Sequence, residues 1–210
     1  MSRTPVADPW PAMQEAAAAL AAPGQPQAIY AALDRILCRI VGAKLFTILV
    51  RHQDSNESER VYTNQPEAYP VGGRKQMKDT PWFRKVIVGK QHFLGPTMAD
   101  VRWAFYDHEL IASLGCGSAI NLLAIHNDVV VGSINMLHEE HWYDQRAIAV
   151  GAPFAQLLIP AFLAHKSSRA AAGQRWPLPP PPPLPPPLPP PFPPPLPPAL
   201  PPALPPASAP

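Results

Sequence analysis

The chain has 210 residues, among them 33 prolines and two cysteines, and a formal net charge of +2 at pH 7. Its basic residues are scattered, which argues against nucleic-acid binding, and two cysteines are too few for a disulfide framework or a four-thiolate metal site. No stretch reaches the ~18 uninterrupted apolar residues of a membrane span, and no apolar leader opens the chain. The sequence therefore predicts a cytoplasmic protein that binds neither nucleic acid nor membrane.

Proline usage divides the chain. Most prolines lie after Trp176, in a stretch rich in Pro and Leu without a charged residue, which excludes helix interiors and central strands. We predict an N-terminal helical extension over residues 1–25, a folded domain over 26–166 and a disordered proline-rich tail over 167–210. Three interpretations of the tail stay open: a polyproline rod that docks on a protein partner, a stiff spacer, or an incidental extension.

Two helices are predicted first. The alanine-rich segment from Pro9 to Ala22 ends at a Pro-Gly pair, which is typical of a short helix with a stop signal. After Pro26 the apolar residues follow helical spacing, at Ile29, Leu33, Ile36, Leu37 and Ile40. Gly42 stands where a glycine would end this second helix.

The middle of the chain alternates strands, loops and short helices. Residues 45–51 and 60–63 are predicted strands on either side of a turn, and residues 69–73 form a glycine-containing loop. Thr80-Pro81 predicts a helix start that continues to about residue 88. In the segment 99–114 we expect Trp103, Phe105 and Tyr106 to be extended or looped, followed by a helical turn over 107–111.

A β-hairpin and a kinked helix close the predicted domain. Residues 117–125 and 129–137 are apolar runs on either side of Asn127-Asp128, a pair that tolerates the left-handed backbone of a tight turn. Residues 144–164 have helical periodicity that Pro153 and Pro160 interrupt, which predicts a kink or two short helices. The element order predicts an α+β fold around a central antiparallel sheet.

Three stretches resemble the GAF family of bacterial sensor domains: residues 69–73 (YPVGG), 114–118 (LGCGS) and 131–137 (VGSINML). The resemblance covers about residues 26–164. It implies N- and C-terminal helices together on one face of the sheet and, on the other face, a ligand pocket under the connection from residue 69 to residue 115. We call this connection the roof.

Candidate ligand-binding residues follow from that arrangement. Aromatic side chains of the roof would form the pocket wall, although they also fill ordinary cores: Trp82, Phe93, Trp103 and Phe105. Charged side chains in the roof would orient a polar ligand or would form local ion pairs in an exposed loop: Asp100, Arg102, Asp107 and His108. Three more candidates lie at the start of the predicted hairpin, where strand alternation decides which of them face the pocket: Cys116, Ser118 and Asn121.

We therefore predict a small-molecule sensor without an output domain of its own, which would form a homodimer through its terminal helices and signal to a partner. One alternative is a thiol enzyme resembling the free methionine sulfoxide reductases, with Cys116 as the reactive thiol, although Cys38 lies on a distant helix and a resolving thiol is missing. Another is a protein-interaction module whose own aromatic side chains fill the pocket.

The remaining motifs point to no further chemistry. His138 and His141 flank two glutamates after a strand, a spacing and context that favour a solvated turn over the helical zinc motif of metalloproteases. No dinucleotide-binding, Walker or serine-nucleophile motif is present. We predict no catalytic residue, cofactor or metal.

Overall fold

A computed structural model describes residues 9–171, so nearly all of the predicted tail lies outside the described residues. The described chain opens with α1 (Trp10–Ala21) and α2 (Gln27–Ile40), which confirm both predicted helices. The apolar stripe of α2 is buried, and α1 places two alanines in the same core. Gly42 has a φ of +91°, and its amide donates a hydrogen bond to the carbonyl of Leu37 at 3.0 Å, which ends α2.

Six strands form one antiparallel sheet in the order β3-β2-β1-β6-β5-β4. Their bounds are β1 Leu45–His52, β2 Glu57–Thr63, β3 Arg74–Gln76, β4 Phe93–Gly95, β5 Ser118–His126 and β6 Val129–His138. The α+β class and the central antiparallel sheet are confirmed. The sequence did not predict β3 and β4, which are edge strands of three residues each.

The hairpin of β5 and β6 turns at Asn127 and Asp128, with φ values of 47° and 61°. Two consecutive residues with positive φ give the turn a twist that matches the twist of the strands. This is the turn that the sequence predicted.

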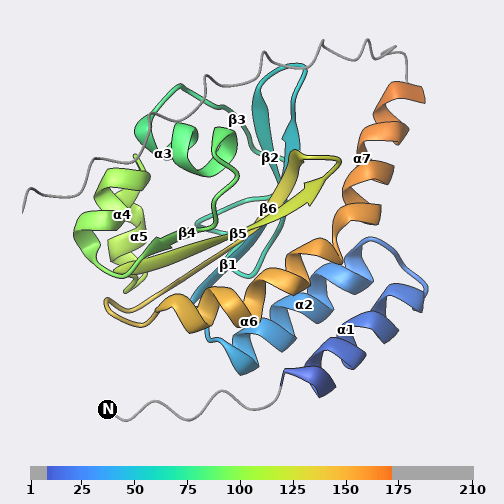
Figure 1. Ribbon diagram of the computed structural model, residues 1–210, viewed down its shortest axis with the longest axis horizontal. Coiled ribbons are helices and arrows are strands. Elements are labelled where there is room, and N and C mark those ends of the chain that lie inside the picture. The colour runs from blue at the N-terminus through green and yellow to red at the C-terminus, as the bar shows by residue number, and fades with distance from the viewer. Residues whose placement is uncertain (1–8, 172–210) are drawn as a thin grey trace, which may run out of the picture. The chain divides into compact units, whose positions relative to one another are not determined.

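One face of the sheet is covered by α2, α6 (Gln145–Gln156) and α7 (Ile159–Ala171), and α1 packs against α2 on the outer side (Figure 1). Asp144 caps α6 because its carboxylate accepts hydrogen bonds from the amides of Arg146 and Ala147 at 2.9 and 3.2 Å. The two short helices predicted around the prolines are confirmed: α6 and α7 meet at an angle of 44°. α7 continues past the predicted domain boundary at residue 166.

The opposite face lies under the roof, which contains α3 (Pro81–Phe83), the π-helix η1 (Arg84–Val88), α4 (Met98–Ala104) and α5 (His108–Ser113) (Figure 1). Trp103 belongs to α4 and is not extended, contrary to the sequence prediction. The reason is a capping box, in which Thr97 and Asp100 each bind the other's backbone amide and so start a helix.

Among residues 9–171, no single helix is long and apolar enough to cross a membrane. α6 and the first part of α7 pass that test together, as a bent pair, by length and composition.

Candidate ligand-binding face

The alternation of side chains along β5 assigns its residues to the two faces of the sheet. Ile120 and Leu122 pack with the helices, whereas Ala119 and Leu123 pack with the roof. Asn121 therefore points toward the roof, because it has the same parity as Ala119 and Leu123. Asn121 is therefore a predicted site residue that contacts both the roof, through Trp82, and the neighbouring strand β6, through Asn135.

A chain of buried polar side chains crosses three central strands on the roof side. Asn121 Nδ2 donates to Asn135 Oδ1 at 2.8 Å, and Asn135 Nδ2 donates to Thr47 Oγ1 at 3.2 Å. Ser133, two residues before Asn135 on the same strand, also donates to Asn135 Oδ1, at 3.1 Å. We call these four residues the polar floor. Thr47, Asn121 and Asn135 are at most 8% exposed.

Aromatic side chains of the roof pack over this floor. The indole Nε1 of Trp82 donates a hydrogen bond to Asn121 Oδ1 at 3.1 Å. Phe105 lies 6.4 Å from Trp82 and 5.8 Å from the buried Phe93, measured between ring centroids. Trp103 stacks on Phe93 from outside and is 49% exposed. The structure thus brings all four predicted aromatic residues together, with Trp82 in direct contact with the floor.

The four predicted charged residues do not form a group over the floor. Asp107 Oδ2 accepts a hydrogen bond from the hydroxyl of Tyr69 at 2.9 Å, which ties two ends of the roof together. Asp100 Oδ2 is engaged in the cap of α4. Arg102 is exposed in the last turn of α4, and His108 begins α5.

Arg60 lies over the ring of Tyr69 at 4.8 Å and covers it from the side of β2. Burial raises the pKa of Tyr69, and the neighbouring Asp107 raises it further, so this phenol stays a hydrogen-bond donor at neutral pH. The hydrogen bond of Asp107 and the contact of Arg60 with Tyr69 therefore hold the roof together.

The two cysteines lie on opposite sides of the sheet. Cys116 packs in the roof-side core, whereas Cys38 packs against the helix-side core and donates a hydrogen bond to Asp34 at 3.1 Å. Burial raises the pKa of the Cys116 thiol, and burial together with Asp34 raises the pKa of Cys38 to about 12. Neither residue has the lowered pKa of a reactive thiol.

Ser118 is separated from the other predicted residues of the hairpin. Its hydroxyl donates to the carbonyl of Glu139 at 2.6 Å, and its parity along β5 is that of the helix-facing Ile120. The residues that the sequence prediction missed are Thr47, Ser133 and Asn135. Ser133 and Asn135 stand two apart within an otherwise apolar strand, and this spacing places two polar side chains on one face.

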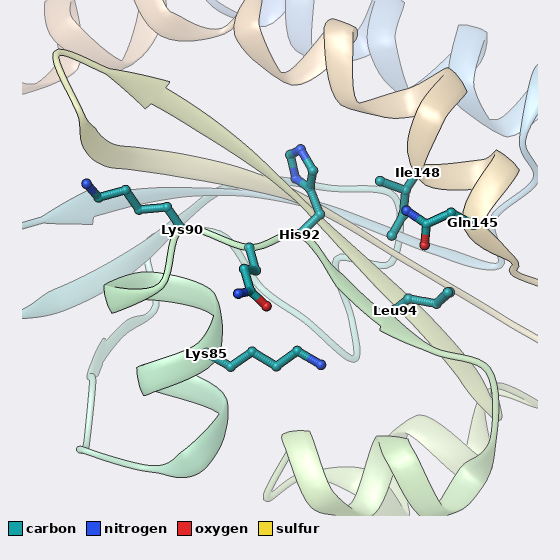
Figure 2. Close-up of a pocket in the computed structure, with 7 residues that line it drawn as sticks. Lys85, Lys90, His92, Leu94, Gln145 and Ile148 are labelled. Atoms are coloured by element: carbon teal, nitrogen blue, oxygen red, sulfur yellow. The ribbon is translucent and has the colours of Figure 1, made fainter. Parts of the chain in front are cut away.

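An open cleft of about 520 Å³ lies at the sheet edge beside β4, away from the predicted residues. Figure 2 shows its lining, in which Lys85 reaches in from η1 and Gln145 from α6. His92 Nδ1 accepts a hydrogen bond from the amide of Leu123 at 3.0 Å, and burial lowers the pKa of this histidine. Its imidazole is therefore the neutral form with the proton on Nε2.

Comparisons with solved structures identify the fold. A GAF domain from a phosphoenolpyruvate-protein phosphotransferase of Coxiella burnetii matches with a TM-score of 0.63 at 15% identity, over 80% of this chain and 99% of that one. The free methionine-R-sulfoxide reductase of Neisseria meningitidis, solved with its substrate, matches with a TM-score of 0.61 at 14% identity, over 80% and 96%. A GAF domain of a sensor histidine kinase from Bacillus halodurans matches with a TM-score of 0.56 at 11% identity, over 69% of this chain and 98% of that one.

No protein-family model matches the chain, and no curated protein matches its sequence. The described residues form an α+β domain whose antiparallel sheet carries helices on one face and a roof on the other. This is a GAF-like fold, as the resemblance in the sequence predicted.

Proposed function

We propose that this chain is a sensory or regulatory domain that binds a small, neutral ring compound between the polar floor and the roof. The observation that carries the proposal is the floor itself. Amide and hydroxyl groups are expensive to bury, and an apolar core of the same shape would serve stability as well or better. Buried polar groups in a GAF-like fold, on the face under the roof, therefore favour a binding role.

Trp82 occupies the position that a ligand would take. Its indole lies on the floor as a flat ring with one N–H donor, and that donor is bound to Asn121 Oδ1. The π-helix η1 follows directly after the three-residue helix that carries Trp82, and π-helical turns are frequent at functional sites. We infer that this short segment moves outward when a ligand replaces the indole.

The floor also indicates the chemistry of the ligand. Its four residues are uncharged, and the predicted acidic residues Asp100 and Asp107 are already engaged in the roof. A charged ligand on the floor would lose its hydration, and none of the four floor residues offers it a partner of opposite charge. The floor fits a neutral aromatic or heteroaromatic compound with an N–H or O–H donor for Asn121.

Indole is the probe for this pocket. In Trp82→Ala the missing side chain leaves a space with the shape of indole between Phe105 and Asn121, and cavities left by a truncated side chain bind matching small rings. We expect 1 mM indole to raise the melting temperature of this variant in the full-length chain, by several degrees once indole is near a hundred times its dissociation constant. The unsubstituted protein should respond less because Trp82 fills the space. Equal responses of the two proteins would contradict the assignment.

The natural ligand class is tested by a thermal-shift screen of the unsubstituted chain against neutral ring metabolites. A compound at a hundred times its dissociation constant adds about 2.7 kcal/mol to the free energy of unfolding. A hit in this pocket should be lost in Asn121→Leu and kept in Lys85→Gln, which alters only the cleft at the sheet edge. Loss in Lys85→Gln alone would move the site to that cleft.

A protein-interaction role is the second candidate, and a specific observation favours it. Trp103 and Tyr106 are 49% and 74% exposed on neighbouring parts of the roof, and exposed aromatic side chains are typical of protein interfaces. A silent screen together with a partner that is lost on Trp103→Ala would support this role. The homodimer through the terminal helices stays a prediction.

A further inference from the structure

Two strands and the last helix bring three side chains with metal-binding atoms together on the helix-covered face of the sheet. His52 Nε2 lies 2.8 Å from Glu59 Oε2, and His165 Nε2 lies 3.4 Å from the same oxygen. His52 ends β1, Glu59 lies in β2, and His165 lies in α7. The three candidate ligand atoms all lie within 4.8 Å of one another.

The fold holds these three residues in place. Glu59 pairs with Val50 across β1 and β2, and His52 has the same parity as Val50, which packs under the helices. His165 lies about one helical turn after Phe162, whose ring is fully buried between α7 and the sheet. The histidine therefore projects from α7 toward the same face. His52 and Glu59 are 6% and 9% exposed, so their side chains have little freedom.

The donor set is that of a divalent metal site. Two imidazole nitrogens and one carboxylate oxygen are ligands of Zn²⁺, and bonds of about 2.0–2.2 Å in a tetrahedron place ligand atoms roughly 3.3 Å apart. The distances of 2.8 and 3.4 Å around Glu59 Oε2 lie close to that spacing. The two imidazole nitrogens lie within 4.8 Å of each other, and a cation between them would draw all three ligand atoms to this spacing.

A cation already lies beside this group, namely the guanidinium of Arg74. Its Nη2 atom donates to Glu59 Oε2 at 2.9 Å and lies 3.3 Å from His52 Nε2. Arg74 belongs to the three-residue edge strand β3, and its Nη1 atom also donates to Glu57 Oε2 at 3.3 Å. Glu57 therefore offers a second carboxylate to Arg74 when the guanidinium leaves Glu59.

We propose that His52, Glu59 and His165 bind a divalent cation of the zinc class. Arg74 moves to Glu57 when the metal enters, and the three protein ligands leave a further position for water or an external ligand. Because two ligands come from the sheet and one from α7, the metal fastens the last helix to the strands. Metal binding at this site is independent of the pocket under the roof.

The test is calorimetric titration of the full-length protein with Zn²⁺ after dialysis against EDTA. We expect one Zn²⁺ per chain and a rise in melting temperature on binding. His165→Gln should fold, because its side chain is partly exposed, and should weaken binding by more than the roughly 10–100-fold that loss of an outer-sphere contact costs. His52→Gln should do the same. His126→Gln, a histidine outside the cluster, should leave the affinity unchanged.

Two further variants make the result decisive. Arg74→Gln removes a competing positive charge and should tighten Zn²⁺ binding at least about tenfold. Co²⁺ in place of Zn²⁺ should give visible absorption bands that disappear in His165→Gln. The proposal is overturned if neither the unsubstituted protein nor Arg74→Gln binds Zn²⁺ saturably, or if His165→Gln binds as tightly as the parent. Either result would leave the cluster as a structural ion-pair network.

Discussion

Replacing Phe162 by alanine should lower the free energy of unfolding by about 3–5 kcal/mol, the usual loss for a fully buried phenylalanine. Its ring is 0% exposed and lies against β6 at Gly132. A Cβ atom at Gly132 would be only 2.4 Å from the Phe162 ring and 2.5 Å from the carbonyl oxygen of Leu49. The ring therefore fits against β6 only because residue 132 is a glycine. Urea unfolding measures the change, with the m-value expected to stay constant.

The neighbouring residue is a matched control for that measurement. Leu163 also lies on α7 but is 36% exposed, so Leu163→Ala should cost less than about 1 kcal/mol. Similar losses for the two variants would contradict the packing of α7 on β6. Phe162→Ala should also weaken Zn²⁺ binding, although it changes no ligand, because His165 depends on the position of α7.

The sequence was informative where the signal is local. The apolar stripe of α2 and the Asn127-Asp128 turn depend on residues a few positions apart, and both predictions are confirmed. The edge strands β3 and β4 are three residues long, too short for the alternation that indicates a strand. The helix α4 was missed because its capping box uses Asp100 in place of the usual Glu or Gln.

The sites needed the tertiary structure. Asn121 was predicted from its strand, but its partners Asn135 and Thr47 come from two other strands, and only the register of the sheet brings them together. His52, Glu59 and His165 are even further apart along the sequence, and they come together only because α7 packs back across the sheet. No spacing in the sequence indicates such a group, and we predicted no metal from it.

Asn135 is the centre of the polar floor, and Asn135→Leu should lower the free energy of unfolding by about 2–4 kcal/mol. The variant removes the side-chain partner of the Thr47 and Ser133 hydroxyls, and it leaves Asn121 Nδ2 with only the carbonyl of Ile120 at 3.3 Å. A buried polar group left unsatisfied costs about 1–3 kcal/mol. Urea unfolding again gives the value. Thr47→Val removes the hydroxyl at one end of this row of hydrogen bonds with little change in side-chain shape, so it should lower the free energy of unfolding by less.

The double variant Asn121→Leu/Asn135→Leu separates a stability role from a binding role. The double variant removes both ends of the Asn121–Asn135 hydrogen bond, so neither amide is left facing a missing partner, as one is in each single variant. Its loss should therefore be smaller than the sum of the two single losses, with a coupling of about 0.5–3 kcal/mol. Strict additivity would mean that the two amides do not interact. If the double variant is nearly as stable as the parent yet no longer binds the ligand of the parent protein, the amides are needed for binding and not for folding. The buried polar floor is then the part of this sheet that recognises a ligand.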